Sequence, residues 1–322
     1  MRNLLPLLAG FAVCAQLASP AGAQDYPTKP IRLIIPYSPG GASDNIARLV
    51  MPRVSEALGQ PIVLENRPGA SGAIGRDLVA KAAPDGYTLL STDAPHAINP
   101  HMVRSLPFDS LRDFSMITTT VTSPMGMVVH ANFPAKTVEE FLKLAKAQPG
   151  KLNFGSGGTG AITQMTGELL KLTTGINIVH VPYKSFGYAM TDLLGEQVQV
   201  VFTSPATASS HVKAGKVRVL AVAATKRLAA FPDLPTFEEA GVPGLVVANW
   251  FGIMGPAKLP PRIVQRMNTE IHKAVRSRDI AERFAAINME PMLITPQEFQ
   301  SMLEAETVRW GKVIKAAGIQ PE

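Results

Sequence analysis

The sequence predicts an α/β fold built from two domains. Short apolar runs alternate with amphipathic helical patterns along the chain, which is the order typical of parallel strands joined by right-handed helical crossovers. The runs are continuous rather than alternating in polarity, as expected for strands covered on both faces. With 322 residues, the chain is long enough for two domains, and its 46% hydrophobic residues can supply their cores.

The first series of elements lies in the N-terminal part of the chain. Ile31 to Tyr37 is a continuous apolar run that predicts a buried strand, and Gly40 to Asp44 opens the helix that follows it. The glycine-rich segment from Asn66 to Gly75 is expected to be structural. In chain order we predict a strand at 31–37, a helix at 46–58, a strand at 62–65, a helix ending near 82 and a strand at 87–91.

A second series begins near residue 124 and ends in a helical tail. Thr137 and Glu140 have the spacing of a capping box, and Thr295 is a predicted N-cap. The predicted strands are 125–130, 151–154, 176–182, 198–203, 217–223 and 246–254, and the predicted helices are 137–147, 161–173, 187–194, 260–277, 279–287 and 296–316. We therefore predict a discontinuous domain, 24–123 with 225–322, and a continuous domain, 124–224.

The N-terminus predicts export. Arg2 is followed by a mostly apolar stretch from Leu4 to Leu17 and then by Ala21-Gly22-Ala23, which is the order of a secretory signal peptide over residues 1–23. Cleavage near Ala23 would release the mature chain into the periplasm. The single cysteine, Cys14, lies inside this segment, so we expect the mature chain to have no disulfide, thiol nucleophile or thiolate metal site.

Charge and motifs argue against several functions. A formal charge of +6 without a basic cluster favours small anionic ligands and does not indicate nucleic-acid binding. The chain lacks the G-x-S-x-G, H-E-x-x-H and P-loop signatures, and only His96 and His101 are closely spaced, so we expect no metal.

Gly155 to Gly160 matches the dinucleotide-binding pattern G-x-G-x-x-G. The next predicted strand ends without the acidic residue that would hold a ribose, so we expect no dinucleotide cofactor.

Two glycine-rich loops each precede a helix. Such a loop exposes unpaired N–H groups and the positive end of the helix dipole, so it can bind an anion. Gly40-Gly41-Ala42 is one loop, and Ser156 and Thr159 add hydroxyl donors to the other. Lys and Arg are absent from 33–47 and 152–170, which favours backbone donors over an arginine clamp. Each loop alone could be only a tight turn between a strand and a helix. Because each of the two α/β series contains such a loop, we favour a shared cleft in which the two loops bind the two ends of a dicarboxylate.

Several motifs occur in the order typical of one family. They are Tyr26-Pro27-Thr28-Lys29-Pro30-Ile31-Arg32, Pro39-Gly40-Gly41-Ala42-Ser43-Asp44, Glu65-Asn66-Arg67-Pro68-Gly69-Ala70-Ser71-Gly72, Pro84-Asp85-Gly86-Tyr87-Thr88-Leu89-Leu90, His180-Val181-Pro182-Tyr183-Lys184 and Leu234-Pro235-Thr236. From about Tyr26 to Ile319, the sequence resembles the substrate-binding proteins of tripartite tricarboxylate transporters, the Bug family. The resemblance implies a type II periplasmic binding protein fold, with two α/β domains closing on a small carboxylated ligand. It implies a two-subunit membrane permease as partner in some cases, and no catalysis.

The resemblance also implies where the ligand lies. The loop from Ser38 to Asp44 would meet one carboxylate through backbone N–H groups and water, and the loop from Ser156 to Ala161 would meet the other end. Asp44 is anionic, so we expect it to cap its own helix or to hold a bridging water. Asp93 and Pro95 depart from the small residues usual in the family. Asp93 could pair with an ammonium group of the ligand, or point to solvent or cap a turn.

Further candidates lie at strand ends. Tyr183 could face the cleft, Lys184 could equally be solvated, and Trp250 could wall the ligand or fill the core. A valine at Gly41 is expected to block the ligand and also to strain the turn. The candidate ligand-binding residues are Ser38, Gly40, Gly41, Ala42, Asp44, Thr92, Asp93, Ser156, Thr159, Gly160, Ala161, Tyr183 and Ser204.

The sequence thus predicts an exported solute-binding protein for a small organic carboxylate. The ligand classes that stay open are a di- or tricarboxylate, an aromatic carboxylate and an acidic amino acid. Uptake through a permease and delivery to a sensor receptor share the same binding chemistry. A secreted hydrolase acting on a small carboxylated substrate, with Ser156 or Ser91 as the tested serine, is the alternative. We expect a monomer without catalytic activity or cofactor.

Overall fold

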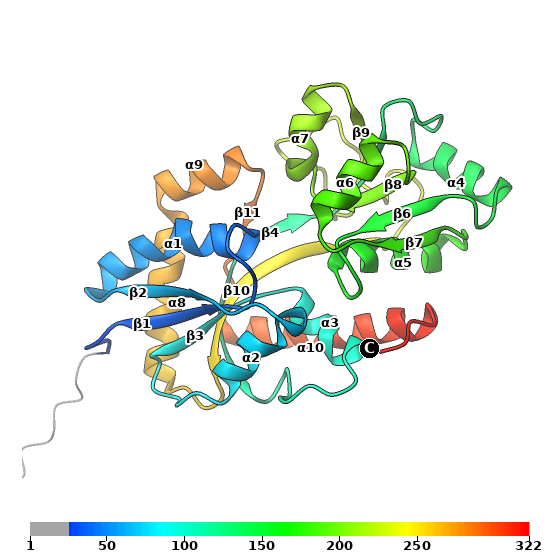
Figure 1. Cartoon of the computed structure of the whole chain (residues 1–322). Helices are drawn as coiled ribbons and strands as arrows, with labels where there is room; N and C mark the ends of the chain where they lie inside the picture. Colours follow the sequence, from blue (N-terminus) through cyan, green and yellow to red (C-terminus); the bar gives the residue numbers. More distant parts are fainter. Residues whose placement is uncertain (1–25, 322) are drawn as a thin grey trace, which may run out of the picture.

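The computed structural model describes residues 26–321 as two α/β lobes (Figure 1). The predicted signal peptide, its cleavage site and Cys14 lie outside the described residues. The first lobe contains a six-stranded sheet with the order β11-β4-β10-β3-β1-β2, and the second contains a five-stranded sheet with the order β7-β6-β8-β5-β9. Across residues 26–321, none of the helices is both long and apolar enough to cross a membrane. The predicted α/β class is confirmed.

The first lobe is formed by the two ends of the described chain. Its N-terminal elements are β1 (Ile31–Ile35), α1 (Ala42–Leu58), β2 (Ile62–Asn66), the 3-10 helix η1 (Ala70–Gly72), α2 (Ala73–Ala80), β3 (Thr88–Asp93), α3 (Pro95–Met102) and β4 (Phe114–Pro124). Its C-terminal elements are β10 (Ala248–Pro256), α8 (Pro261–Arg276), α9 (Arg278–Ala286), β11 (Glu290–Pro291) and α10 (Pro296–Ala316).

Strand β1 organises the packing of this lobe. It lies between β2 and β3 and is parallel to both, with Leu33 paired to Leu64 and Leu89. Successive side chains of a strand point to opposite faces. Leu33 therefore packs in the cluster formed with α1 and α8, whereas Ile34 packs in the cluster that includes α2, α3 and α10. Burial on both faces explains the continuous apolar run in the sequence.

The second lobe is one uninterrupted segment of the chain. Its elements are β5 (Gly126–His130), α4 (Val138–Ala147), β6 (Asn153–Ser156), α5 (Ile162–Thr174), β7 (Val179–Pro182), α6 (Phe186–Leu194), β8 (Val200–Thr203), α7 (Pro205–Lys213) and β9 (Val217–Val222). Strand β6 is parallel to β7 and β8, and β5 is antiparallel to β8 and β9.

Three backbone segments lie side by side where the chain passes between the lobes. The N–H of Met125 donates to the carbonyl of Val247 (2.9 Å), and the N–H of Ala223 donates to the carbonyl of Met125 (2.7 Å). The N–H of Val247 in turn donates to the carbonyl of Ala223 (2.9 Å). The predicted domains, 24–123 with 225–322 and 124–224, stay a prediction, because sheet membership does not test whether the lobes fold or move as units.

Some elements differ from their predicted bounds. Helix α1 begins at Ala42 rather than at residue 46, and β7 begins at Val179 rather than at residue 176. The sequence patterns did not predict α3, β4 or α7. Helix α10 begins as predicted at a capping box, in which the side chains and backbone of Thr295 and Glu298 bond reciprocally.

Candidate ligand-binding site

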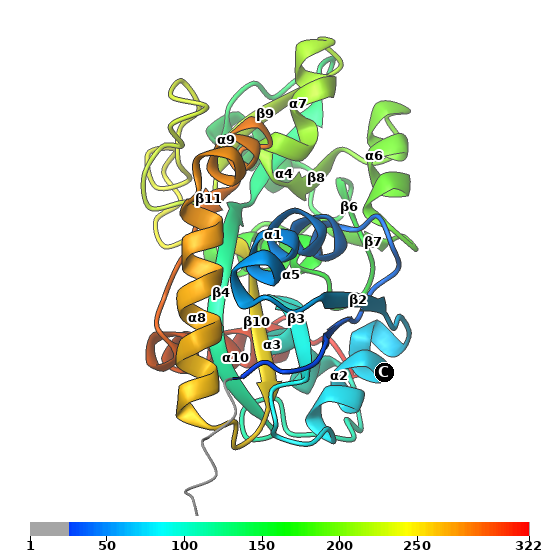
Figure 2. The ribbon, with the colours of Figure 1, turned by 90° about the vertical axis from the view of Figure 1, so that its left-hand side faces the viewer.

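The two predicted ligand loops lie at the boundary between the lobes. The chain runs from β1 outward to β2 and then back to β3, so the carboxyl ends of β1 and β3 flank the place where an open α/β sheet binds ligands. The β1–α1 loop lies on the side of the first lobe that faces the second (Figures 1 and 2). From the other lobe, the β6–α5 loop contacts α3, because a Cβ atom on Gly160 would stand 3.4 Å from Cγ of Met102.

Asp44 closes the β1–α1 loop onto the helix. Its buried carboxylate accepts hydrogen bonds from the N–H of Gly40 (2.9 Å), from Nε of Arg48 (2.9 Å) and from Nδ2 of Asn66 (3.0 Å). These donors, led by Arg48, lower the pKa of Asp44 to about 2. The structure therefore uses the Gly40 N–H internally, which contradicts the expectation that this group is a free donor for the ligand.

The pKa of Asp44 gives a testable consequence for stability. A carboxyl group with a lower pKa in the folded chain stabilises the fold above its unfolded value of about 3.8, and this contribution is lost as the pH falls through 2. Between pH 6 and pH 2, the free energy of unfolding of the parent should therefore fall by about 2 kcal/mol more than that of Asp44→Asn. Urea unfolding at both pH values measures this difference, and an equal fall in both proteins would contradict it.

The first turn of α1 keeps unpaired donors. Gly41 is the N-cap residue and no side chain caps the helix, so the N–H groups of Ala42, Ser43 and Asp44 have no acceptor among residues 26–321. Ser38, Gly41 and Ala42 are exposed, whereas Ser43 is buried. This turn is an accessible, positively polarised helix end.

The strained position in this loop is Gly40 rather than Gly41. Gly40 has a φ of +86°, a region that favours glycine, whereas Gly41 has a φ of −73° and a ψ of 171°, which any residue adopts. A Cβ atom on Gly41 would lie 3.6 Å from the carbonyl oxygen of Ser38, an ordinary contact. The expectation that valine at position 41 strains the turn is therefore wrong.

The β6–α5 loop uses most of its predicted donors internally. The N–H of Gly160 donates to Oε1 of Gln164 (2.8 Å), and the N–H of Ala161 donates to the carbonyl of Gly158 (3.2 Å). Thr159 is exposed, and no side chain caps the first turn of α5. The free donors of this loop are thus at Thr159 and at the first turn of α5, and the expected use of the Gly160 and Ala161 N–H groups is corrected.

Ser156 is buried beneath this loop. Its Oγ lies 2.6 Å from Nε2 of His180 and 3.2 Å from the backbone nitrogen of Gly158. Ser156 has no exposed surface in this structure, and direct assistance of ligand binding by its hydroxyl stays a prediction. Burial lowers the pKa of His180 to about 4, so a neutral ring holds the serine.

Among the described residues, the Ser156–His180 pair lacks two features of a nucleophilic site. A serine nucleophile needs an accessible hydroxyl and a histidine oriented by a third group. Ser156 is fully buried, and no carboxylate within the described part of the chain lies within ion-pair distance of His180. The arrangement instead fixes the β6–α5 loop onto β7, which supports a positioning role for both side chains.

Asp93 lies in a buried network at the end of β3. Its Oδ1 accepts hydrogen bonds from Oη of Tyr37 (2.7 Å) and from Nη2 of Arg76 (3.1 Å). The expectation that Asp93 points to solvent or caps a turn is wrong. Burial raises the pKa of Asp93, and the Arg76 guanidinium opposes this shift. Two donors aimed at one oxygen favour the ionised carboxylate. The neighbouring Thr92 is fully buried, with no hydrogen-bond partner for its Oγ1 among residues 26–321.

The other predicted side chains bond within their own lobes. Oη of Tyr183 donates to Oδ2 of Asp192 (2.6 Å), and Oγ of Ser204 accepts the N–H of Thr207 (3.2 Å) at the start of α7. Burial and the neighbouring Asp192 raise the pKa of Tyr183 to about 12. Trp250 is buried and packs edge-on against Phe299, with ring centroids 5.4 Å apart, so it fills the core. Direct ligand contacts of Tyr183 and Ser204 stay a prediction.

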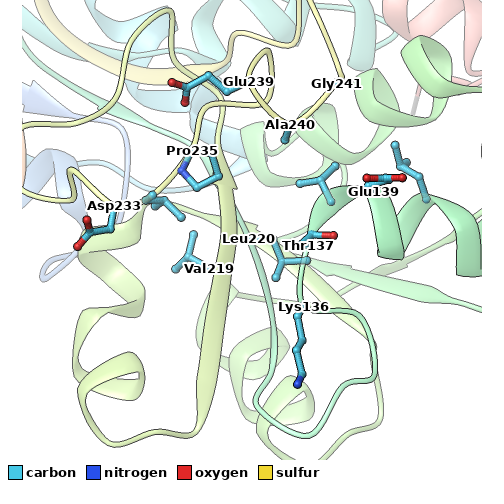
Figure 3. A pocket seen from close by; sticks show the side chains of 13 residues that line it. Lys136, Thr137, Glu139, Val219, Leu220, Asp233, Pro235, Glu239, Ala240 and Gly241 are labelled. Carbon is cyan, nitrogen blue, oxygen red and sulfur yellow. The ribbon is translucent and has the colours of Figure 1, made fainter.

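A pocket of about 660 Å³ lies elsewhere, in the second lobe (Figure 3). It is bounded by the start of α4, by β9 and by residues 233–241. Its labelled charged side chains include Lys136, Asp233 and Glu239, which mix both signs. None of the predicted ligand-binding residues lines it, so it is separate from the candidate site. Within residues 26–321, no cluster of His, Cys, Asp and Glu could hold a metal ion.

Sequence patterns missed three residues that organise the site. Arg76 lies next to a segment interpreted as structural, Tyr37 lies just beyond a strand, and His180 lies within a motif of the family. The signal for Arg76 was the unusual acid at Asp93, because a buried carboxylate needs a partner.

Two α/β lobes joined by crossing backbone segments, with helix N-termini at the loops between them, define a solute-binding protein. The chain belongs to the tripartite tricarboxylate transporter family of receptors, since the family described as "TctC: Tripartite tricarboxylate transporter family receptor" matches residues 46–319. The family and the periplasmic binding protein fold expected from the motifs are confirmed.

Individual relatives extend the similarity over the whole chain. Protein BugT of Bordetella pertussis is 34% identical over 320 residues, covering 99% of this chain and 98% of BugT. The structure of Rpa4515 of Rhodopseudomonas palustris with adipate has a TM-score of 0.82 at 34% identity, and the similarity covers 92% of this chain and 100% of that chain. MatC of the same organism, with bound malate, has a TM-score of 0.78 at 28% identity, covering 90% and 100% of the two chains.

Proposed function

We propose that this protein is an exported solute-binding protein that captures a small organic carboxylate between its two lobes. The observation that carries the proposal is the uncapped and exposed first turn of α1 beside the carboxyl ends of β1 and β3. Unpaired N–H groups and the positive helix end stabilise an anion at this position. The first turn of α5, which also lacks a side-chain cap, offers similar donors from the second lobe.

The ligand class is supported by relatives. Rpa4515 was solved with adipate and MatC with malate, and each of these ligands has two carboxylates. Two helix ends on opposite lobes suit a ligand with a negative charge at each end. We therefore propose a dicarboxylate or a similar acid as the ligand, contacted by Ser38, Gly41, Ala42 and Thr159 together with bridging water.

We propose that the captured acid is delivered for uptake into the cell. A two-subunit membrane permease is the proposed partner, and delivery to a sensor receptor uses the same binding chemistry. We propose that the protein works as a monomer in the periplasm, without catalysis or a cofactor. The buried Ser156 supports the absence of hydrolysis.

Calorimetric titration of the mature protein with malate, succinate, glutarate and adipate tests the proposed function. At least one of these acids should bind with one-to-one stoichiometry. At a free concentration of 100 times the dissociation constant, that acid should stabilise the fold by about 2.7 kcal/mol and raise the melting temperature. Uncharged diols of the same lengths are the control. Absence of binding by all four acids, or hydrolysis of a model ester by pure protein, would count against the proposal.

Export has its own expected outcome. Expression of the full chain in a Gram-negative host should yield a periplasmic protein that begins at Gln24 or close to it, because Ala21-Gly22-Ala23 fits signal-peptidase cleavage. Intact-mass measurement of the periplasmic fraction checks this. Replacing Ala23 by a bulky residue should block processing, and a periplasmic protein that retains Met1 would contradict the expectation.

A further inference from the structure

Arg76 is a fully buried cation in the first lobe. Arginine is almost never fully buried unless it is paired. Its Nη1 donates to the carbonyl of Ser71 (2.8 Å), and its Nη2 donates both to Oη of Tyr37 (2.9 Å) and to Oδ1 of Asp93 (3.1 Å). Nδ2 of Asn99 donates to the same Ser71 carbonyl (3.0 Å). The guanidinium therefore joins η1, the β1–α1 loop and the end of β3.

This network lies at the candidate ligand site. Tyr37 is in the loop that leads to α1, and Asp93 ends β3, the strand next to β1. Helix α2 packs closely beneath both, because a Cβ atom on Gly75 would stand 3.0 Å from Cα of Pro36. A Cβ atom on Gly72 would stand 2.4 Å from Nη1 of Arg76. Glycine at position 72 therefore gives the guanidinium the space that a side chain there would occupy.

The ion pair removes a negative charge from the site. The segments that follow the parallel strands are 36–44, 66–72, 93–95, 157–161, 183–185 and 204–205. Within them, Asp44 and Asp93 are the acidic residues. Arg48 holds Asp44 at 2.9 Å, and Arg76 holds Asp93 at 3.1 Å. An ammonium group on a ligand would therefore lose water without gaining an unpaired carboxylate, which is unfavourable.

We propose that Arg76, by pairing with Asp93, makes the site select carboxylates that carry no amino group over the corresponding amino acids. This inference rests on the proposed capture of carboxylates and names the kind of carboxylate. Arg76 acts through Asp93 and Tyr37, so it is a positioning residue and not a ligand contact.

Matched pairs of acids measure the selectivity. Succinate and aspartate, glutarate and glutamate, and adipate and 2-aminoadipate each differ by one amino group. In calorimetric titrations at pH 7, the parent should bind the unsubstituted acid of its preferred length at least about tenfold more tightly than the amino acid, a difference of about 1.4 kcal/mol.

Substitutions then test whether Arg76 sets this ratio. Arg76→Gln frees the Asp93 charge and should shift the ratio about tenfold or more toward the amino acid. Arg76→Lys keeps the positive charge and should keep the parent ratio. The double variant Arg76→Gln with Asp93→Asn removes both charges and should restore the ratio. Arg32→Gln removes an exposed guanidinium of the same lobe and should change nothing.

Folding of each variant is checked by thermal melting. If Arg76→Gln does not fold, Asp93→Asn replaces it, because it frees the Arg76 charge and should strengthen the preference for the unsubstituted acid. A parent that prefers the amino acids would overturn the inference while leaving carboxylate capture intact. A folded Arg76→Gln variant that keeps the parent's ratio of affinities for the unsubstituted acid and the amino acid would also overturn the inference and leave carboxylate capture intact. A parent that binds no member of any pair would overturn the proposed function and the inference with it.

Discussion

A valine at Gly41 is expected to weaken dicarboxylate binding by at least about 100-fold. The side chain would stand beside the exposed N–H groups of Ala42 and its neighbours, so it would displace a carboxylate that accepts from them. Hydrogen bonds to charged groups contribute about 1.5–3 kcal/mol each, so losing two of them gives at least this factor. The backbone at Gly41 suits valine, so the free energy of unfolding should fall by no more than about 1 kcal/mol, the cost of a poorer N-cap.

Gly195→Val is the matched control for this substitution. Gly195 is the C-cap of α6, so it lies at the C-terminal end of a helix rather than at an N-terminal end. Its φ is −88°, and a Cβ atom there would lie 3.5 Å from the carbonyl oxygen of Thr191. The Gly195→Val variant should bind the acid with the affinity of the parent. Calorimetry and urea unfolding together separate loss of binding from loss of folding. A folded Gly41→Val that binds like the parent would show that the ligand does not use the first turn of α1.

Replacing Trp310 by alanine is expected to have the largest effect on stability. Trp310 is fully buried in α10, and its Nε1 donates to Oε2 of Glu306 (2.7 Å). Removal of a buried tryptophan leaves a cavity and costs about 3–5 kcal/mol. Urea unfolding measures the change. A loss of less than 1 kcal/mol would mean that the site collapses around the missing ring.

The two tryptophans provide an internal comparison for that result. Trp250 is also buried, but its Nε1 has no hydrogen-bond partner among residues 26–321. Trp→Phe at position 310 should lose a hydrogen bond worth about 1 kcal/mol, whereas the same change at position 250 loses none. Equal effects at both positions would indicate that packing alone determines stability there.

The parallel strands could be predicted because strands buried on both faces are continuous apolar runs in the sequence. Strand β4 could not, since its core stretch contains consecutive threonines. Their hydroxyls are satisfied by distant groups: Thr118 bonds to Nε2 of His272 (2.7 Å) and Thr120 to the carbonyl of Phe251 (3.2 Å). Helix α3 was hidden by Pro95 and Pro100, which usually mark turns. Tertiary contacts that are distant in sequence decided both elements.

The location of the candidate site was more predictable than its donors. Glycine-rich turns before helices identified the two loops from local sequence. Which N–H groups stay free depends on side chains that return to the loop, namely Asp44 onto Gly40 and Gln164 onto Gly160. The pairing of Arg76 with Asp93 joins a helix to a strand end, so no local spacing reveals it.

The adjacent entry and exit of the second lobe make it a transferable unit. Met125 and Val247 are hydrogen-bonded neighbours, so the ends of the segment between them lie together where the chain passes between the lobes. Residues 126–246 include the loop at 233–241 that packs on β9. Replacing them by the matching segment of a relative requires only two junctions in backbone that is already aligned. Chimeras made in this way should fold, since each sheet keeps all its strands. They would assign the preference for ligand length to one half of the receptor or the other.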